Sequence, residues 1–495
     1  MFPYPVFRPR DERKEKSMKI LYAASEALPY ASTGGLADVV GSLPKAVRKE
    51  LGDGADVRVV IPLYPAIRRK FAEEIEMVCE MNVKLAWRNQ YCGIWQTVSD
   101  GVTFYFIDNE YYFNRSALYG SFDDAERFAY FGKAVLELMT AIGFYPDVLH
   151  ANDWQTATAV IYLKRKYAHL TAYQNIKTLF TIHNIDYQGI YDFSILGDVF
   201  ELAEWDRGIV EYNGCINLLK GAIVCSDMVS TVSGRYADEI LTEYYASGLH
   251  HILRASQDKL CGIVNGIDVD YYNAEKDPEI ARNFTAAEIS GKAACKAELE
   301  EVCGFAHKAD TPILAMVSRL ASHKGFDLVT RVIEEILTGT NLRFALLGTG
   351  EFELEDFFTR LEERFPGRVC VKLEYNKSLS KIFYAGADMF LMPSKSEPCG
   401  LAQMIASRYG TVPIVRETGG LFDTIHAYNE YDGSGNGFSF TNYNAHEMKN
   451  TVEYAIKLYM EKPEMWAALV KNVMEVDFSW SVSAKKYIDI YTKLQ

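Results

Sequence analysis

The sequence predicts an α/β protein of two domains, each built on a parallel β-sheet with helices on both faces. Three observations lead to this fold class. Strand-like runs alternate with helix-like runs along the 495 residues. The strand-like runs are continuously apolar, as expected of strands covered on both faces. The alternation starts again after about residue 262, and one hydrophobic core rarely serves a chain of this length.

The first half of the chain opens with a strand, a glycine turn and a helix. The strands are expected at residues 19–24, 57–62, 103–108, 148–151 and 177–182, and the helices at 37–50 and 154–167. This order of strands and helices predicts a first Rossmann-like domain at residues 18–262.

The second half repeats the pattern. Strands are expected at residues 312–317, 343–347, 369–373, 389–392 and 411–415, and helices at 327–337 and 354–364. They predict a second Rossmann-like domain at residues 263–473, with the boundary near 262–268. The last residues, 474–495, have an amphipathic pattern that predicts a helix.

Composition excludes several classes of protein. A net charge of −14 and a pI of about 5.3 argue against nucleic-acid binding, which usually needs a basic surface. No run of 18 apolar residues occurs, so no membrane span is expected. Residues 1–17 lack the apolar core of a secretory signal and are interpreted as a disordered extension. The nine cysteines are scattered and odd in number, which favours a reducing cytoplasm over a disulfide framework.

Ligands of open parallel sheets bind beyond the carboxyl ends of the strands, so the cleft between two such domains is the expected site. One glycine loop, Ser32-Thr33-Gly34-Gly35, follows the first strand, and a second, Thr418-Gly419-Gly420, follows the strand at 411–415. Backbone amides that open a helix suit a phosphate, although tight packing alone also explains such loops. Neither loop is a Walker A motif.

Charged residues follow the strands of the second half. Arg319 and Lys324 can neutralise a leaving diphosphate, or they are ordinary surface charges. Glu397, in the segment Glu397-Pro398-Cys399-Gly400, can bind sugar hydroxyls or balance positive charge at an anomeric carbon. It is equally suited to the first turn of a helix. No base is identified that would make the Cys399 thiol a nucleophile.

In the first half, Asp153 and His183 end neighbouring strands and can meet over the cleft. Asp153 could accept the proton of an acceptor hydroxyl, and His183 could contact a donor sugar, although a structural role is open for both. No metal site is expected, because the acidic pair Asp268 and Asp270 is interpreted as part of a turn.

These stretches resemble the bacterial glycogen synthase and plant starch synthase family. The resemblance covers residues 18–495 in order, and eight motifs in sequence are highly specific. They lie at residues 32–44, 150–156, 181–189, 264–268, 318–329, 345–351, 384–403 and 409–425.

The resemblance implies a GT-B fold and a retaining glucosyltransferase without metal or cofactor. It implies transfer of glucose from ADP-glucose to the non-reducing 4-hydroxyl of an α-1,4-glucan. The leaving phosphate would itself take the acceptor's proton, which would account for the missing nucleophile. The partners implied are the nucleotide-sugar donor and the glucan, and the helix at 474–495 would cross back to the first domain.

Carried over by position, the resemblance implies that Arg319 and Lys324 hold the diphosphate and that Glu397 lies near the transferred glucose. Asp153 and His183 would line the reaction centre. The substrate-binding residues implied are Glu26, Ser32, Thr33, Gly34, Gly35, Asn184, Asn265, Tyr375, Cys399, Gly400, Leu401, Thr418, Gly419 and Gly420.

The chain departs from the family pattern at several positions. Ser32 stands where the family has a lysine associated with donor binding, and Glu417 stands where an arginine is common. Losing a cation near a diphosphate costs on the order of 1–3 kcal/mol. Asn152 and Gln155 replace histidines. The wider retaining pattern has a glutamate where Ile405 stands, but glycogen synthases commonly lack that glutamate.

Two alternatives follow from these departures. One is the same fold with UDP-glucose or another donor, and the other is a catalytically weak glucan-binding protein. A phosphorylase is not expected, because the motifs do not match that class.

Overall fold

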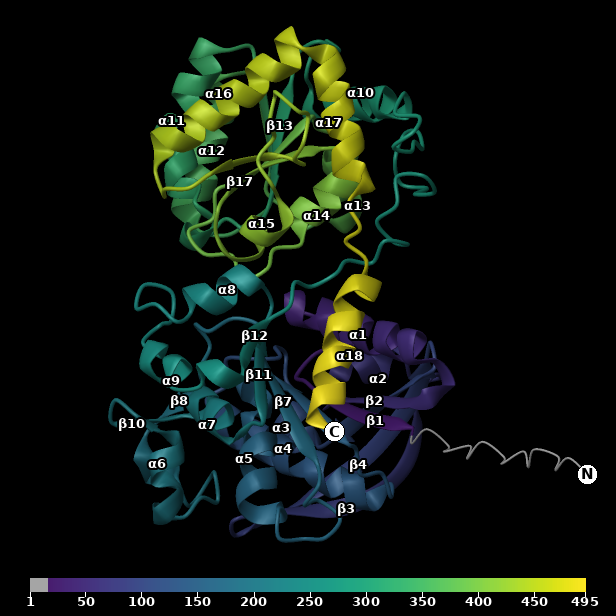
Figure 1. Ribbon diagram of the computed structural model, residues 1–495, viewed down its shortest axis with the longest axis vertical. Helices are drawn as coiled ribbons and strands as arrows, with labels where there is room; N and C mark the ends of the chain where they lie inside the picture. The colour runs from purple at the N-terminus through teal and green to yellow at the C-terminus, as the bar shows by residue number, and fades with distance from the viewer. Residues whose placement is uncertain (1–16) are drawn as a thin grey trace, which may run out of the picture.

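The computed structural model describes residues 17–495 and has two lobes (Figure 1). The expectation for residues 1–16 lies outside the described part. Each lobe contains one large sheet with helices on its faces, and the two large hydrophobic cores are separate. The chain therefore has two Rossmann-like domains, as the alternation of strands and helices predicts.

The first domain contains a nine-stranded sheet of order β12-β11-β7-β6-β1-β2-β5-β4-β3. Seven strands are parallel, and the edge strands β4 and β3 are antiparallel. The strands are β1 (Met18–Ala23), β2 (Ala55–Pro62), β3 (Glu76–Leu85), β4 (Arg88–Ser99), β5 (Val102–Asp108), β6 (Val148–Asn152), β7 (Lys177–Ile182), β11 (Met228–Thr231) and β12 (Leu260–Gly262). A small three-stranded sheet joins β8 (Ile190–Tyr191), β10 (Cys215–Asn217) and β9 (Glu211–Tyr212).

The second domain contains a six-stranded sheet, wholly parallel, of order β15-β14-β13-β16-β17-β18. Its strands are β13 (Ile313–Val317), β14 (Arg343–Leu347), β15 (Val369–Lys372), β16 (Met389–Met392), β17 (Val412–Arg416) and β18 (Phe438–Phe440). The first five match the expected strands to within one residue at each end, because continuous apolar runs mark strands buried on both faces.

Helices cover both sheets (Figure 1). In the described residues, no helix has the length and apolar character needed to cross a bilayer. In the first domain they are α1 (Gly35–Leu51), α2 (Pro65–Lys70), α3 (Glu110–Phe113), α4 (Asp124–Ala141), α5 (Ala157–Tyr162), α6 (Arg207–Val210), α7 (Leu218–Cys225), α8 (Gly234–Glu239) and α9 (His250–Arg254). The others are α10 (Gly291–Cys303), α11 (Phe326–Gly339), α12 (Phe352–Arg364), α13 (Lys377–Gly386), α14 (Ala402–Arg408), α15 (Gly419–Thr424), α16 (Ala445–Glu461), α17 (Pro463–Glu475) and α18 (Trp480–Leu494).

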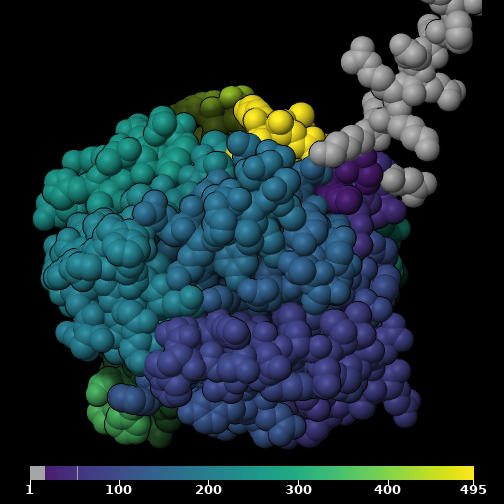
Figure 2. Space-filling view, turned by 90° about the horizontal axis from the view of Figure 1, so that it is seen from below, coloured from purple at the N-terminus to yellow at the C-terminus, as the bar shows by residue number. Residues whose placement is uncertain are grey.

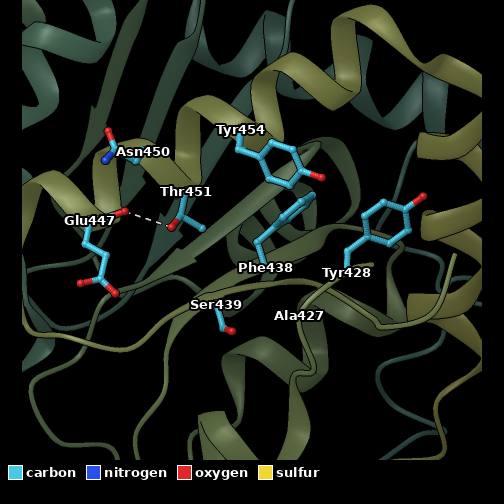
Figure 3. A pocket seen from close by; sticks show the side chains of 8 residues that line it. All are labelled: Ala427, Tyr428, Phe438, Ser439, Glu447, Asn450, Thr451 and Tyr454. Atoms are coloured by element: carbon cyan, nitrogen blue, oxygen red, sulfur yellow. Dashed lines mark hydrogen bonds between the residues drawn. The ribbon is translucent and has the colours of Figure 1, made fainter. Parts of the chain in front are cut away.

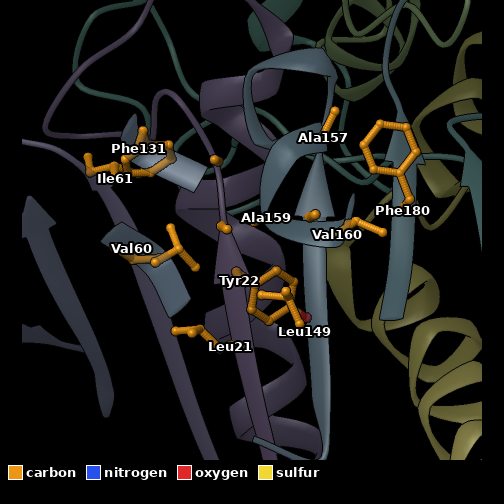
Figure 4. Close-up of a cluster of buried hydrophobic side chains, with 14 of the residues drawn as sticks. Leu21, Tyr22, Val60, Ile61, Phe131, Leu149, Ala157, Ala159, Val160 and Phe180 are labelled. Atoms are coloured by element: carbon orange, nitrogen blue, oxygen red, sulfur yellow. The ribbon is translucent and has the colours of Figure 1, made fainter. Parts of the chain in front are cut away.

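The core of the first domain lies between its central strands and the helices above them (Figure 4). Leu21 of β1 and Leu149 of β6 are register partners there, and Phe180 of β7, paired with Ala151 of β6, extends the layer. The helix expected at residues 154–167 is less regular than predicted. It opens with a 3₁₀ turn, continues as α5 and closes with a π turn at Leu163–Tyr167.

The C-terminal segment corrects one expectation, because residues 474–495 do not form one helix. Helix α17 ends at Glu475, and α18 begins only at Trp480. Between them Asp477 accepts a hydrogen bond from the Ser479 amide at 2.9 Å, and Phe478 is buried in the second core. This turn ends the helix and directs the chain toward the first domain.

Helix α18 lies beside α1, and its apolar face joins the first core (Figure 1). Figure 2 shows the yellow end of the chain at the surface of the first domain. The hydroxyl of Tyr491 lies 2.6 Å from that of Tyr22 and 2.8 Å from Nδ1 of His150. The last helix of the sequence is therefore a structural part of the first domain.

Candidate active site

Several predicted site residues follow the strands at which the strand order of each sheet reverses. In the second sheet this point lies between β13 and β16; Arg319 and Lys324 follow β13, and Glu397 follows β16. In the first sheet it lies between β1 and β6; Glu26 follows β1, and Asp153 follows β6. Loops diverge at such a switch point and leave a crevice for a ligand. We call the site residues of the first domain the first half-site and those of the second domain the second half-site. Both half-sites therefore lie at the crevice that the sheet topology provides.

Asp153 and His183 are brought together as expected. The His183 amide donates to Oδ1 of Asp153 at 2.8 Å, and the Asn184 amide also donates to this carboxylate. Asp153 has a φ of 57° and a ψ of 175°, a strained conformation for a residue with a side chain. The hydrogen bonds from His183 and Asn184 stabilise this conformation and keep the carboxylate near the ends of β6 and β7.

The His183 ring is neutral, because burial lowers its pKa to about 3. Its Nε2 lies 2.9 Å from Oδ1 of Asn152. The Asn152 amide group donates to the carbonyls of Ala23 and His150, so Oδ1 is its acceptor atom. His183 therefore carries its proton on Nε2 and leaves a lone pair on Nδ1. Asn152, which departs from the family histidine, thus fixes the tautomer.

Two carboxyl groups of the first half-site hold their protons unusually tightly. Burial raises the pKa of Glu26 to about 7 and that of Asp153 to about 7. The charge of Glu26 raises the pKa of Asp153 further. Groups that titrate near neutral pH in a cleft are typical of catalytic sites.

The first glycine loop is tied to Glu26. The backbone amide and the hydroxyl of Thr33 both donate to its carboxylate, the hydroxyl at 2.8 Å. Gly34 and Gly35 are exposed, and a side chain at either would meet open space. No side chain of the described residues caps the N-terminus of α1. This loop therefore leaves the backbone at Gly34 and Gly35 exposed next to Glu26, and its binding of a phosphate stays a prediction.

The second half-site centres on an ion pair. Nζ of Lys324 lies 2.7 Å and 3.0 Å from the two oxygens of Glu397. The Ser394 hydroxyl also donates to Glu397, at 3.0 Å, and the glutamate is only 6% exposed. Arg319 is exposed and lies near this pair. Burial is the main cause that lowers the pKa of His323, and the charges of Lys324 and Arg319 lower it further. The buried carboxylate thus holds Lys324 in a fixed position.

Cys399 is not a nucleophile, because burial raises the pKa of its thiol to about 12. Its sulfur accepts a hydrogen bond from the Asn265 amide, which links the segment between the domains to the Glu397 loop. Oδ1 of Asn265 is buried and has no hydrogen-bond partner among the described residues. Gly400 has a φ of 74°, which favours glycine, and Leu401 precedes α14.

The second glycine loop differs from the expectation. Its amides were expected to approach phosphate or sugar, but protein groups already accept from them. The Gly419 amide donates to both oxygens of Glu239 at 3.1 Å, and Thr418 donates to the same carboxylate at 3.1 Å and 3.2 Å. The Gly420 amide donates to the carbonyl of Glu397 at 3.1 Å. This loop therefore joins the two domains.

The structure shows the surroundings of three further positions named in the sequence analysis. Ser32 is exposed at the rim of the first loop, and Tyr375 is 83% exposed after β15. Glu417 stands where an arginine is common in the family, and its carboxylate accepts hydrogen bonds from the Ser439 hydroxyl at 2.7 Å and the Thr441 hydroxyl at 2.9 Å. The carboxylate of Glu417 is therefore hydrogen-bonded to residues in and just after β18.

Residues of the two domains influence each other across the cleft. The charge of Lys377 acts on Asp38 of α1, and Asp186 of the first domain acts on His323 of the second. Tyr119 is also part of the first half-site, where it hydrogen-bonds to Glu26 and lies 2.7 Å from the Ser25 hydroxyl. Sequence reasoning gave these residues no role, because their interactions join segments that lie far apart in the chain.

One pocket lies away from these groups (Figure 3). It measures about 270 Å³ and lies in the second domain, between β18 and α16. Tyr428, Phe438 and Tyr454 gather on one side of it, and Glu447 lies on the other. It contains no predicted site residue, so the cleft remains the candidate site.

Comparisons with known proteins cover nearly the whole chain. Residues 19–255 match the starch synthase catalytic domain, and residues 303–473 match the glycosyl transferases group 1. A glycogen synthase of Geobacillus thermodenitrificans is 45% identical over 96% of this chain and 98% of its own length. One from Bacillus cereus strain B4264 is 46% identical over 96% of this chain and all of its own length. The catalytic domain of starch synthase IV from Arabidopsis thaliana, bound to ADP and acarbose, superimposes with a TM-score of 0.88 at 33% identity, covering 97% of this chain and 99% of that domain.

Proposed function

The chain belongs to the glycogen synthase and starch synthase family and has its GT-B fold, and from this premise we propose that it extends an α-1,4-glucan from ADP-glucose. The enzyme is a glucosyltransferase. The glucose would join the non-reducing 4-hydroxyl of the glucan with retention at the anomeric carbon. The observation that carries this proposal is the Lys324–Glu397 pair at one switch point, together with Asp153 at the other, where the His183 amide donates to it.

The donor would lie across the cleft, with its diphosphate near Arg319 and Lys324. Two cations at the end of β13 would stabilise the negative charge that the leaving nucleotide acquires. Glu397 holds Lys324 and is itself buried, so this charge arrangement is preorganised. The exposed amides of Gly34 and Gly35 would contribute from the other side of the cleft.

The acceptor hydroxyl would approach from the side of the first domain. Ionised Asp153 would orient this hydroxyl and balance positive charge at the anomeric carbon. Neutral His183 can bind sugar hydroxyls without adding charge. The family resemblance implies a front-face transfer in which the leaving phosphate takes the acceptor's proton, and the protonated thiol of Cys399 fits a transfer that uses no thiolate.

The donor nucleotide is the finer part of the proposal. The relative that was solved with ADP supports ADP-glucose. Ser32, exposed where the family has a lysine, favours UDP-glucose or another donor as the second candidate.

Transfer of labelled glucose to glycogen, with ADP-glucose and UDP-glucose run side by side, tests the proposal. We expect transfer from ADP-glucose, and Lys324→Ala should abolish most of it. Preference for UDP-glucose would replace the donor assignment. Folded protein that binds glycogen but transfers from neither donor would instead support a glucan-binding role, and an unimpaired Lys324→Ala variant would refute the assigned site.

A further inference from the structure

Helix α8 of the first domain is in contact with α15 of the second domain, where the two lobes meet (Figure 1). Glu239, the last residue of α8, is only 4% exposed, and burial raises the pKa of its carboxyl group. Arg235, one turn earlier, lies 3.4 Å from the carboxylate. A carboxylate is buried at low cost only when other groups supply hydrogen bonds to it.

These hydrogen bonds come from the other domain. Thr418 and Gly419 give the carboxylate a hydroxyl and an amide, with donor–acceptor distances of 3.1–3.2 Å. Hydrogen bonds to an ionised acceptor are about twice as strong as neutral ones. Glu239 therefore holds the first turn of α15 in a defined position relative to the first domain.

That turn lies directly on the segment Glu397–Cys399. A Cβ at Gly419 would come within 1.9 Å of the Glu397 carbonyl oxygen, and a Cβ at Gly420 would come within 2.1 Å of the Cys399 carbonyl oxygen. The Gly420 amide also donates to the carbonyls of Glu397 and Pro398, at 3.1 Å and 3.2 Å. With no side chain between the two backbones, movement of α15 moves the Glu397 loop.

We propose that Glu239 is a positioning residue, which sets the Glu397–Lys324 pair through α15 when the two domains are in contact. The proposal rests on the proposed function, because Glu397 and Lys324 are the groups that would meet the donor. It makes the approach of α8 to α15 a condition for a correctly formed donor site. The contact between the domains and the correct geometry of the donor site therefore form together.

Three variants test the role. Glu239→Ala removes the hydrogen-bond acceptor. Glu239→Gln keeps the length of the side chain and one acceptor oxygen but removes the charge. The matched control is Asp423→Asn. Asp423 of α15 accepts from the Arg235 amide at 3.1 Å, so it lies in the same interface, but within the described residues it makes no hydrogen bond to the Glu397 loop.

Two measurements separate positioning from simple stabilisation. The first is kcat together with the KM values for donor and glycogen. The second is amide hydrogen exchange of residues 394–403, read by mass spectrometry, which needs no activity. The loss of hydrogen bonds to a charged group predicts a kcat about tenfold to a hundredfold lower in Glu239→Ala. We expect a raised donor KM, an unchanged glycogen KM and faster exchange of residues 394–403.

Glu239→Gln should recover part of kcat, and Asp423→Asn should behave like the unchanged protein. The proposal is wrong if Glu239→Ala keeps its kcat and exchange rate, or if Asp423→Asn loses as much. If Glu239→Ala does not fold, Glu239→Gln decides by the same two measurements. If the unchanged protein transfers from no donor, the proposed function fails, and the exchange of residues 394–403 alone still decides the positioning role.

Discussion

Asp153 combines two features that each cost free energy in a folded protein. Its φ of 57° is rare for a residue with a side chain, and burial raises its pKa to about 7. Because the folded protein holds this proton more tightly than the unfolded chain, the free energy of unfolding falls as pH rises from about 4 to about 7. Such costs are expected where geometry serves a reaction.

The pH dependence of transfer should report this carboxyl pair. If ionised Asp153 balances charge at the anomeric carbon, kcat should rise with an apparent pKa near 7, in the range where Glu26 also titrates. The charge of Glu26 raises the pKa of Asp153, so Glu26→Gln should move the rising limb to lower pH. Rate profiles between pH 5 and pH 9 measure both; a limb that moves to higher pH would contradict the assignment.

Ser32 gives a prediction about donor affinity. A lysine there would face the exposed amides of Gly34 and Gly35, so Ser32→Lys should lower the Kd for ADP about tenfold, an effect that salt should weaken. Calorimetry with ADP at two salt concentrations measures it. Ser290→Lys, at the start of α10, is the control for a general change in charge. An equal gain in both variants would show that the cleft is not the cause.

At the residue scale, the sequence places a side chain best where it directly follows a buried strand. Asp153 and His183 directly follow β6 and β7, because the end of an apolar run is visible in the sequence, and Glu397 follows β16 after a short loop; their roles in the reaction stay predictions. Glu239 was missed because its partners lie 179 and 180 positions away. Its position inside α8 resembles that of any solvent-facing glutamate, and only the folded contact distinguishes it.

The elements differ in how far their sequences specify them. Strand β13 is continuously apolar, β14 is apolar after its first residue, Arg343, and both were predicted to within one residue. Strands β3 and β4 were not predicted, because β3 is largely exposed and its residues include charged and polar ones that look like loop. An antiparallel edge pair is held by its neighbour in the sheet, a contact that composition does not reveal.

Helices α4 and α5 give a prediction about packing. A Cβ at Gly132 would lie 2.0 Å from the Thr158 hydroxyl oxygen and 2.7 Å from the Ala159 amide nitrogen. Gly132→Ala should therefore destabilise the first domain by about 1–3 kcal/mol, since the backbone of α5 must move. Thermal unfolding measures the loss. Gly339→Ala at the end of α11, where a Cβ meets open space, is the control; equal stability of both variants would refute the close packing.

At the scale of the whole molecule, two chain segments cross between the domains and pair with each other. The Ile267 amide donates to the Phe478 carbonyl at 2.9 Å, and the Ser483 hydroxyl donates to the Val264 carbonyl at 2.7 Å. The two domains and their cleft were predictable from the repeated pattern of strands and helices. This pairing was not, because it joins residues more than 200 positions apart.

The pairing of the two crossing segments depends on Gly266. A Cβ at this position would lie 2.6 Å from the Trp480 amide nitrogen and 2.8 Å from the Ser479 carbonyl carbon, both backbone atoms that cannot rotate away. Gly266→Ala should therefore separate the segments and loosen the orientation of the domains. We expect a larger radius of gyration in solution scattering and a lower kcat, because the half-sites would meet less often.

Gly339→Ala controls for the substitution itself, since it adds the same methyl group in open space. Comparing the scattering profile with kcat shows whether Gly266→Ala acts on the orientation of the domains or only on its neighbour Asn265, whose amide donates to the Cys399 sulfur. If Gly266→Ala lost activity with an unchanged scattering profile, the effect would be local to the Glu397 loop. A changed profile with full activity would mean that the paired segments do not set the working arrangement of the domains. Only joint loss of both supports the paired crossing as the element that orients the cleft.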